Sequence, residues 1–105
     1  MKLVLVLTTL GADADAAALA RTLVEERLAA CVNVLPAMTS IYRWKGSVEQ
    51  DREQQLLIKT APERVDALEA RLRQLHPYEL PEFLVLAASG SDAYLGWIDE
   101  VVPRR

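Results

Sequence analysis

The chain has 105 residues and a mass of 11.7 kDa, which suits one domain, because two separate units would each have too small a core. Hydrophobic residues make up 51% and charged residues 26%, which excludes a disordered or collagen-like protein. The 12 basic and 15 acidic residues give a net charge of -3, whereas nucleic-acid binding depends on neutralising phosphates. We therefore expect a single domain, residues 1–105, that does not bind nucleic acid.

Cysteine and histidine, the residues that most often bind transition metals, are scarce. Cys31 is the single cysteine and cannot form a disulfide within the chain, and His76 is the single histidine, so one chain cannot supply a two-histidine metal site. The chain has no glycine-flanked serine and no glycine-rich phosphate loop, so we predict no catalytic residues and no enzyme. No stretch approaches the roughly 20 apolar residues of a membrane span. The expected location is the cytoplasm, with no membrane contact.

The first part of the chain predicts a strand and a helix. The apolar run at residues 3–7 predicts a buried strand, after which Gly11 turns the chain. Apolar residues at helical spacing predict an amphipathic helix from about residue 13 to residue 29, capped by Asp13 or Asp15.

A hairpin follows the predicted helix. From Cys31 the polarity alternates with a period of two, which predicts a long strand that Pro36 divides, because proline cannot donate to a strand ladder. Lys45, Gly46 and Ser47 supply a tight reversal before a second extended segment, residues 48–60.

The tip of this hairpin is mostly polar and extends beyond its own hydrophobic core. An isolated two-stranded ribbon is marginally stable in water, so we expect a neighbouring copy to support it. Tyr, Trp and Arg are enriched at protein interfaces. The predicted subunit-interface residues are Tyr42, Arg43, Trp44 and, from the last helix, Trp97.

The rest of the chain predicts a helix, a strand and a short final helix. Pro62 begins the first of these helices, which ends near His76 because Pro77 disfavours helical angles in the residue before it. The continuous apolar run at residues 83–88 predicts a strand buried on both faces. The final helix precedes a basic tail, residues 104–105.

This order of elements predicts an α+β fold. Strand, helix, strand, strand, helix, strand is the order of the ferredoxin-like βαββαβ sandwich, here with an extra C-terminal helix and an extended hairpin between its second and third strands. In that arrangement the two long helices cover one face of a four-stranded antiparallel sheet.

His76 is the best single candidate for function. It lies at a helix end beside a loop that contains Glu79 and Glu82, and imidazole is a frequent metal ligand. The structural alternative is that His76 bonds the free carbonyl groups at the end of its own helix.

Five segments of the sequence carry a family resemblance. They are Leu28-Ala29-Ala30-Cys31-Val32-Asn33, Ser40-Ile41-Tyr42-Arg43-Trp44-Lys45-Gly46, Ile58-Lys59-Thr60, His76-Pro77-Tyr78-Glu79-Leu80-Pro81-Glu82 and Tyr94-Leu95-Gly96-Trp97-Ile98. In order and spacing the chain resembles the CutA divalent-cation tolerance proteins from about Leu3 to Val102. The resemblance implies a ferredoxin-like subunit in a homotrimer, similar in assembly to PII signalling proteins, whose hairpin joins sheets across subunits. It also implies a cytoplasmic role in tolerance to copper and other divalent cations, without an enzymatic reaction.

The resemblance also implies a copper site that this chain retains only in part. The ligands proposed in the family are a cysteine in the first strand and two consecutive histidines before Pro-Tyr, and here these positions hold Thr8, Leu75 and His76. Thiolate and imidazole ligands select copper, so we expect weak binding. His76 and Glu82 from three copies are the predicted metal residues. Copper or another divalent cation is not expected to be required for folding.

Two other functions remain open. A PII-like signalling or scaffold trimer would bind a small ligand in clefts between subunits, without metal chemistry. It predicts the convergence of Arg43, Lys45, Lys59 and Tyr78 on one pocket. A metal-dependent hydrolase would require three oxygen or nitrogen ligands around an open position.

Overall fold

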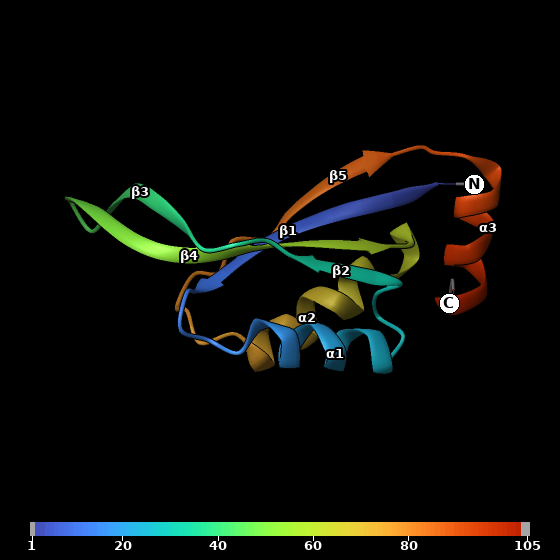
Figure 1. Ribbon diagram of the computed structural model, residues 1–105, viewed down its shortest axis with the longest axis horizontal. Coiled ribbons are helices and arrows are strands. Elements are labelled where there is room, and N and C mark those ends of the chain that lie inside the picture. The colour runs from blue at the N-terminus through green and yellow to red at the C-terminus, as the bar shows by residue number, and fades with distance from the viewer. Residues whose placement is uncertain (1, 104–105) are drawn as a thin grey trace.

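The structure is a computed structural model that describes residues 2–103, so the predicted basic tail at residues 104–105 lies outside the described part. The chain forms a mixed α/β fold with an antiparallel sheet and three α-helices (Figure 1). In chain order the elements are β1 (Leu3–Gly11), α1 (Ala16–Glu25), β2 (Cys31–Val34), β3 (Met38–Trp44), β4 (Ser47–Thr60), the short 3-10 helix η1 (Pro62–Arg64), α2 (Val65–Leu75), β5 (Leu84–Ala88) and α3 (Asp92–Val101). Pro36 lies in the gap between β2 and β3, which confirms the predicted division of the strand.

The sheet is built around β1 and β4. Its order is β2-β4-β1-β5, and every neighbouring pair is antiparallel. β4 has 14 residues, so its second half pairs with β2 while its first half pairs with β3. β3 and Ser47–Glu53 of β4 form a two-stranded ribbon, which we call the arm. The arm projects beyond the rest of the sheet (Figure 1).

The arm closes in a two-residue turn, one residue shorter than the predicted reversal, because Ser47 already pairs as the first residue of β4. Trp44 pairs with Ser47, and between them Lys45 and Gly46 have φ angles of 49° and 83°. Two consecutive residues with positive φ give the turn type whose twist matches that of the two strands, and glycine adopts such an angle without steric cost.

The main core lies between one face of the sheet and the two helices α1 and α2 (Figure 1). Val6 of β1 and Ile58 of β4 are fully buried there, and burial of such a side chain contributes about 1.5–3 kcal/mol. The core cluster consists of Val4, Val6, Leu23, Leu28, Ala29, Ile58, Leu68 and Leu72. At the far end from the arm, α3 buries Leu95 and Ile98 in a second cluster with Leu3.

The helix α1 is shorter than predicted. Asp15 caps it by accepting a hydrogen bond from the Ala18 N–H at 3.0 Å, as one of the two capping alternatives expected. The predicted end at residue 29 is wrong, because the helix stops at Glu25 and Arg27 turns left-handed with φ of 59°. The helix α2 follows η1 and stops before His76, as expected. Among the described residues, no helix combines the length and apolar character that crossing a membrane requires.

α3 covers one end of the second face of the sheet, where Leu3 packs against it, and no helix of the described part of the chain lies over the rest of this face (Figure 1). Leu84 and Leu86 of β5 are 52% and 46% exposed. They pair with Leu7 and Leu5 of β1, and directly paired residues lie on the same face. Leu57, the partner of Leu7 on β4, completes an apolar patch that we call the leucine face: Leu5, Leu7, Leu57, Leu84 and Leu86. The expectation that residues 83–88 are buried on both faces is therefore wrong for the single chain, because β5 is an edge strand.

Two buried threonines of the sheet make a matched pair for testing a missing hydrogen bond. Thr60 Oγ1 donates to the Leu28 carbonyl oxygen at 2.8 Å, whereas Thr8 Oγ1 has no partner within residues 2–103. Because an unsatisfied buried hydroxyl costs free energy, we expect Thr8→Val to raise the free energy of unfolding by about 1 kcal/mol. Thr60→Val, the control, should lower it by a similar amount. Urea denaturation at one chain concentration measures both, and a destabilised Thr8→Val would contradict the prediction.

Candidate functional site

A groove of about 1090 Å³ lies between the arm and the segment that joins α2 to β5. Tyr42 and Trp44 of β3 form its aromatic wall. Pro77, Tyr78 and Pro81 line it from the connecting segment, where the two prolines restrict the backbone.

Carboxylates outnumber cations on the lining of this groove. The acids are Asp13, Asp51, Glu53, Glu79 and Glu82. The described lining contains one cation, Arg52, and its guanidinium donates to Thr39 Oγ1 at 3.2 Å. Lys45 Nζ lies 3.6 Å from Glu79, but both side chains are exposed, so this ion pair is weak. The groove is therefore a region of negative potential.

Two tyrosines donate hydrogen bonds to the groove carboxylates. Tyr42 donates to Asp51, and this bond is the main cause that raises the pKa of Tyr42 to about 12. Tyr78 Oη donates to Glu53 Oε2 at 2.8 Å. Burial is the main cause that raises the pKa of Tyr78, and the bond to Glu53 raises it further. Both phenols are therefore protonated at neutral pH.

His76 is 8% exposed, and both of its ring nitrogens have partners. Nε2 lies 2.6 Å from the Thr9 carbonyl oxygen, and since a carbonyl oxygen only accepts, Nε2 carries the proton of the neutral ring. Nδ1 accepts a hydrogen bond from the Tyr78 N–H at 3.1 Å. The ring thus bonds β1 and not the carbonyl groups of its own helix, which corrects the structural alternative expected from the sequence.

Glu82 is held at the same end of β1 through Gln55. The Gln55 amide donates to the Thr8 carbonyl oxygen at 2.8 Å and to Glu82 Oε2 at 2.9 Å. His76 and Glu82 therefore attach the connecting segment to two consecutive residues of β1. No group of three or more His, Cys, Asp or Glu in the described range is arranged to hold a metal ion. Within one described chain, His76 and Glu82 therefore lack the further ligands that a metal site requires. Their assignment as metal ligands stays a prediction.

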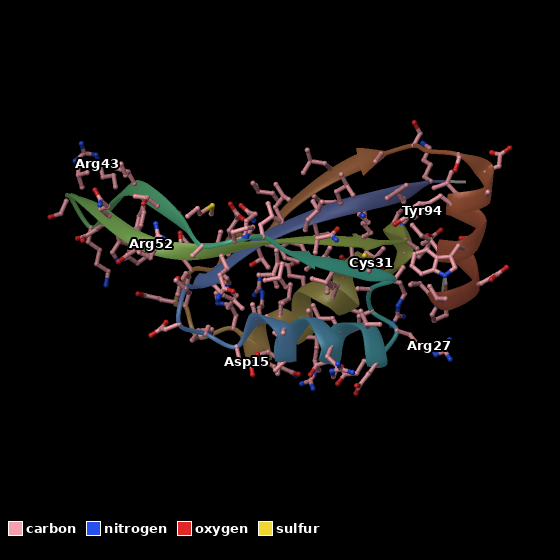
Figure 2. All side chains as sticks on the ribbon, in the orientation of Figure 1. Asp15, Arg27, Cys31, Arg43, Arg52 and Tyr94 are labelled. Carbon is pink, nitrogen blue, oxygen red and sulfur yellow. The ribbon has the colours of Figure 1, made fainter. Side chains whose placement is uncertain are left out.

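The structure separates other residues that the sequence singled out. Arg43 lies at the tip of the arm, whereas Cys31 and Tyr94 lie toward the opposite end of the molecule (Figure 2). Lys59 Nζ is 5.8 Å from the centroid of the Tyr94 ring, so Lys59 does not converge with Arg43 within one described chain. Trp97 packs on Tyr94, far from the aromatic residues of the arm.

Sequence reasoning missed Glu53 and Gln55 as parts of the site. Glu53 is 8% exposed and Gln55 is half-buried, although both belong to the polar half of β4. The alternation of side chains between the two faces of a strand could have identified them, because it places Asp51, Glu53 and Gln55 on the same face of β4.

The raised pKa of Tyr78 predicts a loss of stability at alkaline pH. A folded pKa above the usual 10.0 means that the folded chain retains a proton that the unfolded chain releases, so stability is complete below about pH 10 and falls as the pH rises. We expect Tyr78→Phe to reduce this fall, and Glu53→Gln to reduce it in part. Urea denaturation at about pH 8 and about pH 11 measures the slope. Equal slopes in all three proteins would contradict the prediction.

The sequence of this chain is similar to the sequences of one protein family. The sequence pattern of the family described as CutA1 divalent ion tolerance protein matches residues 4–101. The divalent-cation tolerance protein CutA of Thermus thermophilus is 48% identical over 96 residues, which cover 90% of this chain and 93% of that protein. The protein of the same name from Pectobacterium atrosepticum is 48% identical over 97 residues, covering 91% of this chain and 88% of that protein.

Solved structures of such proteins superpose on nearly the whole chain. The solved divalent cation tolerance protein from Thermus thermophilus superposes with a TM-score of 0.90 and 46% identity, covering 95% of this chain and 98% of the other. CutA1 from Oryza sativa superposes with a TM-score of 0.93 and 33% identity, covering 100% and 97%. Because sequence and structure agree over almost all residues, the chain belongs to the CutA1 divalent ion tolerance family.

Proposed function

We propose that this protein acts in tolerance to divalent cations as a homotrimer of ferredoxin-like subunits, without catalysing a reaction. Related proteins are named for tolerance to divalent cations. The strand order, with β1 and β4 central and α1 and α2 over one face, supports the ferredoxin-like assignment. The leucine face is the main observation that supports a trimer.

The leucine face supports assembly because an open antiparallel sheet normally presents polar residues to water. Here five leucines lie on that side, and contiguous apolar surface of this kind marks an interaction site. The arm supports assembly as well. β1 ends at Gly11, so the part of β4 before Glu53 has no strand partner on that edge within the described residues. An unpaired strand edge is a template for pairing with another chain.

Replacing one leucine tests the trimer. We expect the wild-type mass in solution to be three times the chain mass of 11.7 kDa, and Leu86→Glu to give a folded single chain, because a carboxylate would be buried at the contact. Val24→Glu is the matched control: Val24 is similarly exposed but lies on α1, on the other side of the sheet. Sedimentation measures all three. A Leu86→Glu protein that remains a trimer would remove the leucine face from the interface.

A weak cation site is the second part of the proposal. His76 and Glu82 are held at one end of β1, and copies related by symmetry would complete the set of ligands that one chain lacks. For His76 to bind copper or another divalent cation, Nδ1 must release the Tyr78 N–H. Losing this hydrogen bond keeps the affinity low. The fold has its own hydrophobic core, so the cation is not required for folding.

Calorimetric titration of the metal-free protein with Cu(II) tests this site. We expect weak binding to the wild type, weaker binding to Glu82→Gln and none to His76→Ala, and faster hydrogen exchange of the Tyr78 amide on adding Cu(II). Glu25→Gln, which alters an exposed acid on α1, is the control. Equal binding by the wild type and His76→Ala, or none by either, would exclude His76 as a ligand.

The cytoplasm is our proposed location. It is supported by Cys31, a free thiol that suits a reducing compartment. One solved relative, from Archaeoglobus fulgidus and 28% identical, is described as a periplasmic protein. Cell fractionation decides between the two compartments.

A further inference from the structure

Three carboxylates in the groove have no cationic partner among residues 2–103. Asp51 and Glu53 each accept a hydrogen bond from a tyrosine hydroxyl, and both tyrosines are neutral. Glu82 accepts one from the neutral Gln55 amide, and none of the three acids forms an ion pair. Glu53 is only 8% exposed, and a charge buried to this extent is normally paired with an opposite charge. The groove therefore holds negative charge that a bound cation would neutralise.

The end of the groove nearest the turn of the arm already holds an ammonium group. Lys45 Nζ lies 5.6 Å from the centroid of the Trp44 ring and 3.6 Å from Glu79 Oε2. Trp44 and Glu79 both line the groove. An ammonium group is attracted both by the face of an aromatic ring and by a carboxylate. The position of Lys45 thus shows which kind of cation this lining attracts.

The same two kinds of group recur farther along β4, toward its pairing with β1, but without a lysine. The rings of Tyr42 and Tyr78 line the groove beside Asp51 and Glu53, to which their hydroxyl groups donate. Arg52, the one cation of the described lining, donates to a threonine of β3 and pairs with neither acid. This part of the groove therefore offers aromatic rings and carboxylates to a cation from outside the chain.

An organic cation suits the lining of one chain better than a metal ion does. Divalent metal ions are held by several ligand atoms at once, and no group of three or more His, Cys, Asp or Glu in residues 2–103 is arranged in that way. Prolines and aromatic rings also line the groove, and they pack against methylene groups. A ligand with ammonium groups on an aliphatic chain uses both the charged and the apolar parts of this lining.

The spacing of the acids favours two ammonium groups on one ligand. Glu53 and Gln55 lie on the same face of β4, and two residues span about 7 Å along a strand. The Gln55 amide holds Glu82 Oε2 at 2.9 Å. A second carboxylate therefore lies a short distance beyond Glu53 along the strand, within reach of a second ammonium group on a chain of a few carbon atoms.

We propose that the groove binds a short aliphatic diamine in its doubly protonated form. One ammonium group binds at Asp51 and Glu53 beside the rings of Tyr42 and Tyr78, and the other binds at Glu82. The methylene chain between them packs on the apolar part of the lining. This inference goes beyond the proposed role in tolerance to divalent cations. It does not depend on the trimer, because every residue that it uses belongs to one chain.

Calorimetric titration of the metal-free protein with putrescine, a four-carbon diamine, tests the proposal. At about pH 7 both of its amino groups are protonated. We expect saturable binding of one putrescine per chain, at least about tenfold tighter than that of butylamine, which has one ammonium group on a chain of the same length. The diol of the same length carries no charge and should not bind.

Variants locate the two ends of the ligand. Glu53→Gln keeps an oxygen that accepts from Tyr78 but removes the charge, so it should weaken putrescine binding at least about tenfold. Glu82→Gln should weaken the binding of putrescine and leave that of butylamine unchanged. Tyr42→Leu should bind putrescine about threefold more weakly than Tyr42→Phe, which keeps the ring. Glu25→Gln, at an exposed acid on α1, is the control, and far-UV circular dichroism confirms that each variant is folded.

Each contrary outcome removes a stated part of the proposal. No saturable binding of putrescine, or equal binding by the wild type and Glu53→Gln, overturns the site. Equal binding of the diol overturns the role of charge, and equal binding of butylamine overturns the second ammonium position. If magnesium chloride displaces putrescine more strongly than sodium chloride of equal ionic strength, the groove selects a metal ion and the assignment to a diamine is wrong. None of these results bears on the trimer.

Discussion

The antiparallel pairing of β1 with β4 is the interaction on which the rest of the structure depends. It runs from Val4↔Thr60 to Gly11↔Glu53 and places the two halves of the chain side by side. β1 has 9 residues and β4 has 14, so β4 continues after β1 has ended. β3 pairs with the remainder on one edge, and the other edge stays open. The arm, the groove beneath it and the unpaired edge all follow from this difference in length.

A second mismatch, between β1 and β5, explains how His76 is used. β5 pairs with β1 only as far as Leu7, so the next part of β1 lacks a strand on that side. Side chains instead donate hydrogen bonds to the carbonyl oxygens of this part of β1: the Gln55 amide donates to Thr8 and the His76 ring donates to Thr9. The histidine thus helps replace a missing strand. Any role in binding a cation has to compete with this structural role, because the same ring nitrogen cannot serve Tyr78 and a metal.

The single chain leaves two kinds of surface incomplete. On one face of the sheet, leucines are partly open to water, and on the arm, Arg43, Asp51 and Glu53 make no ion pair among residues 2–103. Exposed apolar surface of this kind marks an interaction site, and a second copy would cover the leucines.

Local chemistry in the sequence determined most of the elements. Pro36 ends β2, Lys45 and Gly46 reverse the arm, and Pro77 stops α2, because each acts on its own backbone. The tertiary structure decided the rest. An apolar strand such as β5 has the same sequence pattern whether a helix or another copy of the chain covers it. The exposure of β5 in the single chain was therefore not predictable from the sequence. His76 found its partner Thr9 across 67 residues of chain, and such a contact exists only once β1 and β4 have paired and placed the connecting segment beside them.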